Sequence, residues 1–78
     1  MTMDYHKKVN EVIAAKAGVD VHEIEPEAFF EDDLNLSSME LVEILAELEE
    51  VFQIELVEEK DNIETVQDLL DLVAEQVE

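Results

Sequence analysis

The chain contains no cysteine and no arginine, and it has one glycine and one proline among its 78 residues. Without cysteine it has no disulfide, no thiolate metal site and no thiol nucleophile, so any thiol chemistry must come from an added group. It has no Gly/Ser linker, which favours a stand-alone protein. No apolar run approaches the roughly 20 residues that span a bilayer, and no signal peptide is recognisable. We therefore expect a cytoplasmic protein without a membrane span.

Positive charge is also scarce. The sequence has 23 acidic residues against four lysines, which gives a formal net charge of −19. From residue 21 onward, 20 acidic side chains are opposed by Lys60 alone. A field of this sign repels nucleic acid and anionic membranes and attracts basic protein surfaces. So acidic a composition is typical of disorder, but 47% of the residues are hydrophobic and they recur periodically, which indicates a folded chain.

We interpret residues 1–78 as one small domain, whose core is thin at this length. Apolar residues at helical spacing predict helical segments at 3–17, 38–52, 57–61 and 66–77. No segment has the sustained alternation that is typical of a strand. We therefore expect an all-α fold, a small antiparallel helical bundle of three main helices plus one short helix, with a long first loop.

The long first loop covers residues 18–36, an unusual length in so small a domain. Gly18 is expected to end the first helix, and Thr65 to cap the last one with Asp68 at the third helical position. We expect the apolar residues of the loop to pin it across the core: Val19, Val21, Ile24, Phe29, Phe30, Leu34 and Leu36. The expected buried faces of the two later helices are Leu41, Ile44, Leu45, Leu48, Val51 and Phe52, and Val66, Leu69, Leu70, Val73 and Val77.

Two adjacent serines stand at the start of the second helix. Ser37 is a suitable N-cap, and Glu40, three residues later, completes a capping box. Ser38 then places a hydroxyl at the exposed first position of the helix. One side of this helix carries a glutamate stripe, and an apolar strip lies beside it: Glu40, Glu43, Glu47 and Glu50, and Met39, Val42 and Ala46.

Several segments, taken in order, resemble the acyl carrier protein family over nearly the whole chain. They are Phe30-Glu31-Asp32-Asp33-Leu34, Ser38-Met39, Glu43, Leu48-Glu49-Glu50-Val51-Phe52, Ile54-Glu55-Leu56 and Thr65-Val66-Gln67-Asp68. No single segment is decisive. Their order and spacing, together with the length and charge of the chain, make the resemblance strong.

In that family a serine at the start of the second helix receives 4′-phosphopantetheine through a phosphodiester, and by spacing this serine is Ser38. The resemblance implies that this covalent cofactor supplies the missing thiol. Acyl groups would travel on it as thioesters between enzymes of fatty acid, lipid or polyketide synthesis, and the chain itself would not be an enzyme. The implied partners are the acyl chain and the basic surfaces of phosphopantetheinyl transferase and of acyl-processing enzymes. We expect a monomer that binds no nucleic acid.

The glutamate stripe and the apolar strip together predict a docking surface with an apolar centre and a charged rim. Its residues are Met39, Glu40, Val42, Glu43, Ala46, Glu47 and Glu50. The strip is also compatible with peripheral core. The resemblance further implies that an acyl chain is sheltered in an expandable space among Phe30, Leu45, Leu48, Leu56, Ile63 and Leu70. The sequence alone does not separate a sealed core from an expandable one.

The sequence departs from the family's usual Asp-Leu-Gly-x-Asp-Ser-Leu pattern at three positions. Asn35 replaces glycine and is well suited to a positive φ, and Met39 is a mild replacement for leucine. Ser37 replaces aspartate. It still caps the helix but supplies no negative charge, which suggests a specialised carrier. Ser37 is also the rival site of modification.

Two other functions stay open from the sequence. One is an unmodified carrier-like module for acidic protein interactions, which the missing aspartate favours. The other, a small hydrolase that uses Ser38, is weaker, because neither His6 nor His22 has a partner spaced for a relay and no oxyanion-hole glycine pattern is present. Both histidines are expected on the surface. No metal site is predicted, because the acidic clusters form no EF-hand loop.

We predict that the melting temperature at neutral pH rises with ionic strength, because screening relieves the self-repulsion of the −19 charge. Thermal unfolding followed by circular dichroism in increasing NaCl, and separately in Mg²⁺, measures this effect. A melting temperature that does not respond to salt would contradict the prediction.

Overall fold

The structure, a computed structural model, describes residues 5–77. The described residues form three α-helices and two 3₁₀ helices: α1 at Tyr5–Ala17, η1 at Val21–Glu23, α2 at Ser38–Phe52, η2 at Val57–Asn62 and α3 at Val66–Val77. The predicted all-α fold of three main helices and one short helix is confirmed. The first two residues of the predicted helix 3–17 lie outside the described residues. The short helix η1 within the long first loop was not predicted.

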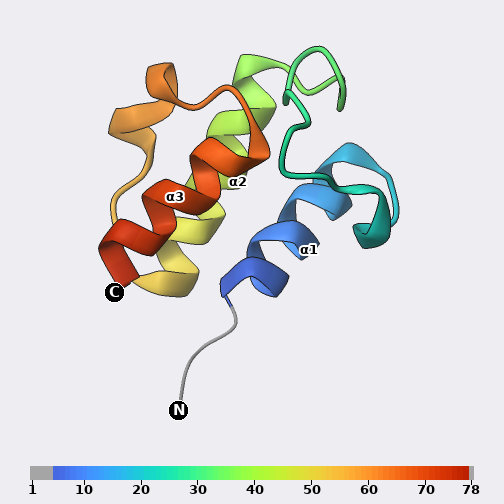
Figure 1. Ribbon diagram of the computed structural model, residues 1–78. Coiled ribbons are helices and arrows are strands. Elements are labelled where there is room, and N and C mark those ends of the chain that lie inside the picture. Colours follow the sequence, from blue (N-terminus) through green and yellow to red (C-terminus); the bar gives the residue numbers. More distant parts are fainter. Residues whose placement is uncertain (1–4, 78) are drawn as a thin grey trace.

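The three α-helices pack with α1 in contact with both α2 and α3. In Figure 1, α1 runs opposite to α2 and α3, whereas α2 and α3 run in the same direction. They do so because the connection between them, which includes η2, returns the chain to the end of the bundle where α2 begins (Figure 1). Among the residues that the structure describes, no helix combines the length and the apolar character that crossing a membrane requires.

The core is formed by apolar side chains from all three α-helices and from both connections. Its buried members are Val9, Val12, Ile13, Ala14, Ile24, Phe30, Leu36, Ile44, Leu45, Leu48, Phe52, Leu56, Ile63, Val66, Leu69, Leu70 and Val73. No polar or charged residue of the described chain is buried with them. The predicted faces of the helices are therefore largely confirmed, and Leu41 is partly buried against the core.

Three residues predicted to be buried are exposed, namely Phe29, Val51 and Val77, with exposed fractions of 43%, 41% and 37%. Phe29 lies in extended backbone that bridges to Thr65, where successive side chains point to opposite sides. Its neighbour Phe30 takes the inward position. Val51 lies at the edge of the apolar face of α2, about 100° from the buried Phe52. Val77 is in the last turn of α3, at the end of the described chain.

The long first loop is ordered by backbone hydrogen bonds to the start of α3. Phe30 N–H donates to the carbonyl of Glu64 over 3.0 Å, and Val66 N–H donates to the carbonyl of Ala28 over 3.0 Å. The predicted anchoring of this loop is thus achieved partly by main-chain contacts and not by apolar side chains alone. These bonds bring the segment that precedes α2 against the segment that precedes α3.

Positive-φ residues mark the ends of these segments. Gly18 has φ +74° and ends α1 as predicted, with its N–H donating to the Ala14 carbonyl over 2.9 Å. Asn35 has φ +56°, which confirms that asparagine makes the turn where glycine is usual in the family. Gln53 has φ +58° and ends α2 in the left-handed conformation. Thr65 and Asp68 cap α3 reciprocally, as predicted. Asp68 N–H donates to Thr65 Oγ1 over 3.2 Å, and Thr65 N–H donates to Asp68 Oδ2 over 3.1 Å.

The start of η2 is fixed by a carboxylate from α2. Glu49 Oε2 accepts the backbone N–H of Leu56 over 2.6 Å and that of Val57 over 3.0 Å. The hydrogen bonds from Val57 and Leu56 lower the pKa of the Glu49 carboxyl below its ordinary value of 4.5. These two charge-assisted hydrogen bonds hold the second connection against α2. Glu49 is half-buried, so the bonds form in a partly desolvated site.

We expect Glu49→Ala to lower the free energy of unfolding at pH 7 by about 2 kcal/mol, because two partly buried N–H groups lose their charged acceptor. Glu49→Gln, which keeps an oxygen acceptor, should lose about half as much. Denaturant unfolding measures both. Glu47 is exposed, and its side chain accepts no hydrogen bond from the described residues. It gives the matched control Glu47→Ala, for which we expect a change within about 0.5 kcal/mol.

The effect of Glu49→Ala should also depend on pH. The carboxyl pKa is lower in the folded than in the unfolded protein, so its stabilisation is present above the unfolded pKa. It is lost as the pH falls through the folded pKa. The difference between the wild type and Glu49→Ala should therefore shrink below pH of about 4.5. A difference that stays constant down to strongly acidic pH would show that the charge on Glu49 contributes nothing.

Candidate functional site

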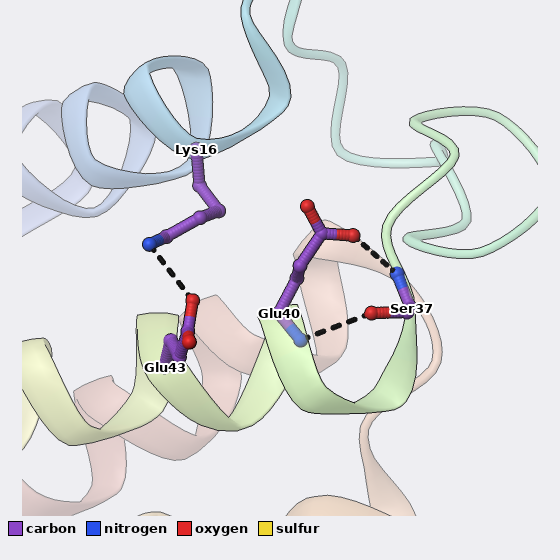
Figure 2. A network of polar contacts seen from close by, with 4 residues as sticks. All are labelled: Lys16, Ser37, Glu40 and Glu43. Carbon is purple, nitrogen blue, oxygen red and sulfur yellow. Dashed lines mark hydrogen bonds and ion pairs between the residues drawn. The ribbon is translucent and has the colours of Figure 1, made fainter.

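Ser37 and Glu40 cap the start of α2 with two reciprocal hydrogen bonds, as predicted. Ser37 Oγ accepts the Glu40 N–H over 3.2 Å, and the Ser37 N–H donates to Glu40 Oε1 over 2.9 Å. Figure 2 shows both bonds side by side at the first turn of the helix. The Ser37 N–H holds the pKa of the Glu40 carboxyl below its usual range. Both side chains are therefore engaged in maintaining the helix start.

Ser38 is the first residue of α2, and its situation differs from that of Ser37. Its side chain is exposed, and its hydroxyl has no hydrogen-bond partner among the described residues. The first backbone N–H groups of a helix lack intrahelical acceptors and carry a partial positive charge. An anion attached to this hydroxyl would therefore lie next to favourable dipoles. The residues present fit a phosphate ester at Ser38.

A cleft of about 380 Å³ opens beside Ser38, between the loop that precedes α2 and the segment 60–64. Its walls are partly apolar and its rim is charged: Phe29, Phe30, Leu36, Leu41 and Ile63, and Glu31, Asp32, Lys60, Asp61 and Glu64. A second and more open hollow of about 440 Å³ also borders Ser37 and Ser38. The hydroxyl thus stands at the mouth of a space that has apolar walls.

The six residues expected to surround an acyl chain fall into two groups. Phe30 and Ile63 line the cleft beside Ser38. All six are buried in the core, and the other four do not line the cleft, namely Leu45, Leu48, Leu56 and Leu70. In this structure the cleft reaches the first pair only, and the core beyond it is packed.

The four glutamates of the predicted stripe are not equivalent. Glu43, Glu47 and Glu50 are exposed, whereas Glu40 is half-buried and bonded to Ser37. Glu43 forms an ion pair with Lys16 of α1, in which Lys16 Nζ lies 2.9 Å from Glu43 Oε1. In Figure 2, the Lys16 side chain extends from α1 toward α2, and the Glu43 carboxylate points toward it. Among the described residues, the carboxylates of Glu47 and Glu50 are therefore the two of the stripe that accept no hydrogen bond.

The apolar strip next to the stripe is largely open to solvent. Met39 has an exposed fraction of 73%, Ala46 is exposed and Val42 is half-buried. The reading of these residues as peripheral core is therefore wrong for Met39 and Ala46. Met39 follows Ser38 directly, so the strip begins next to the candidate attachment site.

Sequence reasoning missed three residues near the site. Phe29 lines the cleft from its exposed position, and Lys60 lies on the cleft rim, where its Nζ is 3.2 Å from Asp61 Oδ1. Lys16 is the cation on Glu43. Because Lys16 and Glu43 are 27 residues apart, their pairing depends on the tertiary packing of α1 on α2 and has no local signal.

The histidines lie away from the cleft. His6 of α1 and His22 of η1 are exposed, and neither lines the space beside Ser38. Within residues 5–77, no group of three or more His, Asp or Glu side chains is arranged to hold a metal ion. The geometry therefore offers Ser38 no relay of the kind that a serine hydrolase uses.

Comparison with known proteins agrees with this geometry. The family described as "Phosphopantetheine attachment site" matches residues 7–73. An acyl carrier protein of Rubrobacter xylanophilus is 44% identical over 70 residues, which cover 88% of this chain and 86% of that protein. An acyl carrier protein of Thermosynechococcus vestitus is 40% identical over 72 residues, which cover 91% of this chain and 89% of that protein.

These matches extend over most of the chain and include the start of α2. They account for the covalent 4′-phosphopantetheine and for the carriage of acyl groups between acyl-processing enzymes. With its helical bundle and its exposed helix-start hydroxyl, the chain belongs to the acyl carrier protein family.

Proposed function

We propose that Ser38 Oγ is the atom to which 4′-phosphopantetheine is attached. The observation that carries this proposal is the contrast between the two serines. Ser37 Oγ is occupied by the Glu40 N–H, whereas the Ser38 hydroxyl is exposed and has no partner among the described residues. Modification of Ser37 would remove a helix cap, at a cost of about 1 kcal/mol. Modification of Ser38 leaves the cap intact.

The attachment is a phosphoryl transfer from coenzyme A. A bond forms between Ser38 Oγ and the phosphorus that bears the pantetheine, and the bond from that phosphorus to the bridging oxygen of the pyrophosphate breaks. The hydroxyl proton passes to a base, and adenosine 3′,5′-bisphosphate leaves. The start of α2 contributes N–H groups close to the new phosphodiester, where the positive end of the helix favours an anion. When bound, the arm supplies the thiol that holds an acyl group as a thioester.

The cleft beside Ser38 is the space in which the arm, or the first part of the acyl chain that it carries, would be sheltered. Its apolar wall includes Phe29, Phe30 and Ile63, and Phe30 is also one of the buried core residues. A space of about 380 Å³ is of the size that small-molecule sites have. An acyl chain that enters beyond it must displace core side chains, since Leu45, Leu48 and Leu56 are fully buried.

The docking of partner enzymes is proposed to use the exposed outer side of α2. Its centre is the strip of Met39, Val42 and Ala46, and Glu47 and Glu50 are its available charges. Each exposed ion pair with a basic partner contributes only about 0.2–1 kcal/mol. Such contacts favour fast and transient encounters, which suits a carrier that visits several enzymes in turn.

The proposed partners are the basic surfaces of phosphopantetheinyl transferase and of acyl-processing enzymes. The −19 charge supports attraction of such surfaces at long range. The protein is further proposed to be a cytoplasmic monomer of one domain, residues 1–78, with no catalytic activity of its own. Because the chain has no cysteine, the reactive thiol belongs to the arm.

We expect the wild-type chain to gain one phosphopantetheine when it is incubated with coenzyme A, Mg²⁺ and a broad-specificity phosphopantetheinyl transferase. Intact-mass spectrometry measures the gain. Ser38→Ala should abolish it, because the acceptor oxygen is removed while the Ser37 cap remains.

Ser37→Asp is the matched control, since aspartate keeps an N-cap acceptor but removes the rival hydroxyl. This variant should still be modified. Its melting temperature, compared with that of the wild type, shows whether the helix start is preserved. Modification of Ser38→Ala, or its loss in a folded Ser37→Asp variant, would move the attachment site to Ser37.

A further inference from the structure

Lys16 places a positive charge of this chain on the docking surface proposed above. Its Nζ lies 2.9 Å from Glu43 Oε1, and the two side chains retain exposed fractions of 33% and 53%. Lys16 belongs to the last turn of α1, whereas Glu43 lies in the middle of α2. As Figure 2 shows, the ammonium group approaches α2 from the neighbouring helix and meets the Glu43 carboxylate, which points toward it.

The influence of Lys16 extends along the glutamate stripe. Its pKa is raised chiefly by the hydrogen bond and the charge of Glu43, and to a smaller extent by the charges of Glu47 and Glu40. One ammonium group thus interacts with three of the four stripe glutamates. Since Glu40 accepts a hydrogen bond from the Ser37 N–H, both glutamates nearest Ser38 already have a partner in the free protein.

We propose that Lys16 is a built-in competitor for basic partners: it occupies Glu43, weakens docking, and directs the partner's cations to Glu47 and Glu50. This inference rests on the proposed docking surface and adds to it a residue that tunes affinity. Because both side chains of the ion pair remain partly exposed, the pair is weak and a partner can displace it. Docking therefore remains reversible.

The occupant to which this surface is suited is a basic protein surface that presents arginine. Guanidinium binds carboxylate with two parallel hydrogen bonds, whereas an ammonium group acts as a point charge. A partner with an arginine opposite Glu43 can replace Lys16 there. A partner that presents only lysine gains little by exchanging one ammonium group for another. Lys16 thus makes Glu43 a position of discrimination between partners.

A double-mutant cycle tests the competition directly. The probe is an immobilised broad-specificity phosphopantetheinyl transferase at low ionic strength, and the measured quantity is the Kd. Coenzyme A is left out and every variant keeps Ser38, so binding is measured without transfer. The variants are Glu43→Gln and Glu47→Gln, each in the wild-type chain and in the Lys16→Gln background. The cycle also includes Lys16→Gln alone, and thermal melts confirm that every variant is folded.

In the wild-type chain we expect Glu43→Gln to change the Kd little and Glu47→Gln to weaken binding roughly two- to fivefold, the range of an exposed ion pair. Lys16→Gln alone should tighten binding by a similar factor. In the Lys16→Gln background, Glu43→Gln should weaken binding as much as Glu47→Gln does. Lys8→Gln is the matched control, because it removes the same charge from the same helix without touching Glu43. It should tighten binding less than Lys16→Gln.

Equal effects of Glu43→Gln in the two backgrounds would overturn the competition while leaving the docking surface in place. The same conclusion would follow if Lys16→Gln and Lys8→Gln tightened binding equally, since general charge would then explain both. If even Glu47→Gln left the Kd unchanged, the docking surface itself would be wrong and the role of Lys16 would fall with it. The attachment of the arm to Ser38 would be untouched, because its mass measurement is independent.

Discussion

The reciprocal capping of α2 by Ser37 and Glu40 is the interaction on which the site depends. Ser37, the residue just before the helix, accepts a backbone N–H of the first turn that has no acceptor within the helix. Ser38 is consequently free of any capping duty, and its hydroxyl faces solvent at the positive end of the helix dipole. One hydrogen-bonding arrangement thus separates two adjacent and chemically identical hydroxyls. It also explains how serine can replace the aspartate that is usual in the family and still preserve the helix start.

In the described chain, apolar side chains form the buried core and charged side chains lie outside it. The buried core of the described chain contains no polar or charged residue, so the acidic side chains of residues 5–77 are all at least partly exposed to solvent. Several of them have structural tasks: Glu49 holds η2, Asp68 caps α3 and Glu40 caps α2. Glu47 and Glu50 of α2 have no such structural contact, and in the proposal above they are the charges that partners bind.

Much of this fold could be predicted from the sequence, because its signals are local. Apolar spacing gave the three α-helices, Ser37 and Thr65 gave their caps, and Gly18 and Asn35 gave the turns with positive φ. The exposure of Phe29 could not be predicted, since it depends on a bridge to Thr65, 36 positions later in the chain. The ion pair of Lys16 likewise requires the packing of two helices. The position of the site could be predicted from the sequence pattern. The hydrogen bonds were needed to give a physical reason for preferring Ser38 over Ser37.

The most direct test of this account is a phosphorus–proton correlation spectrum of the modified protein. Three-bond coupling links the phosphorus of the arm to the β-protons of the serine that bears it. The account predicts a correlation to the β-protons of Ser38, because Ser37 Oγ remains the cap of α2. A correlation to the β-protons of Ser37 would contradict it.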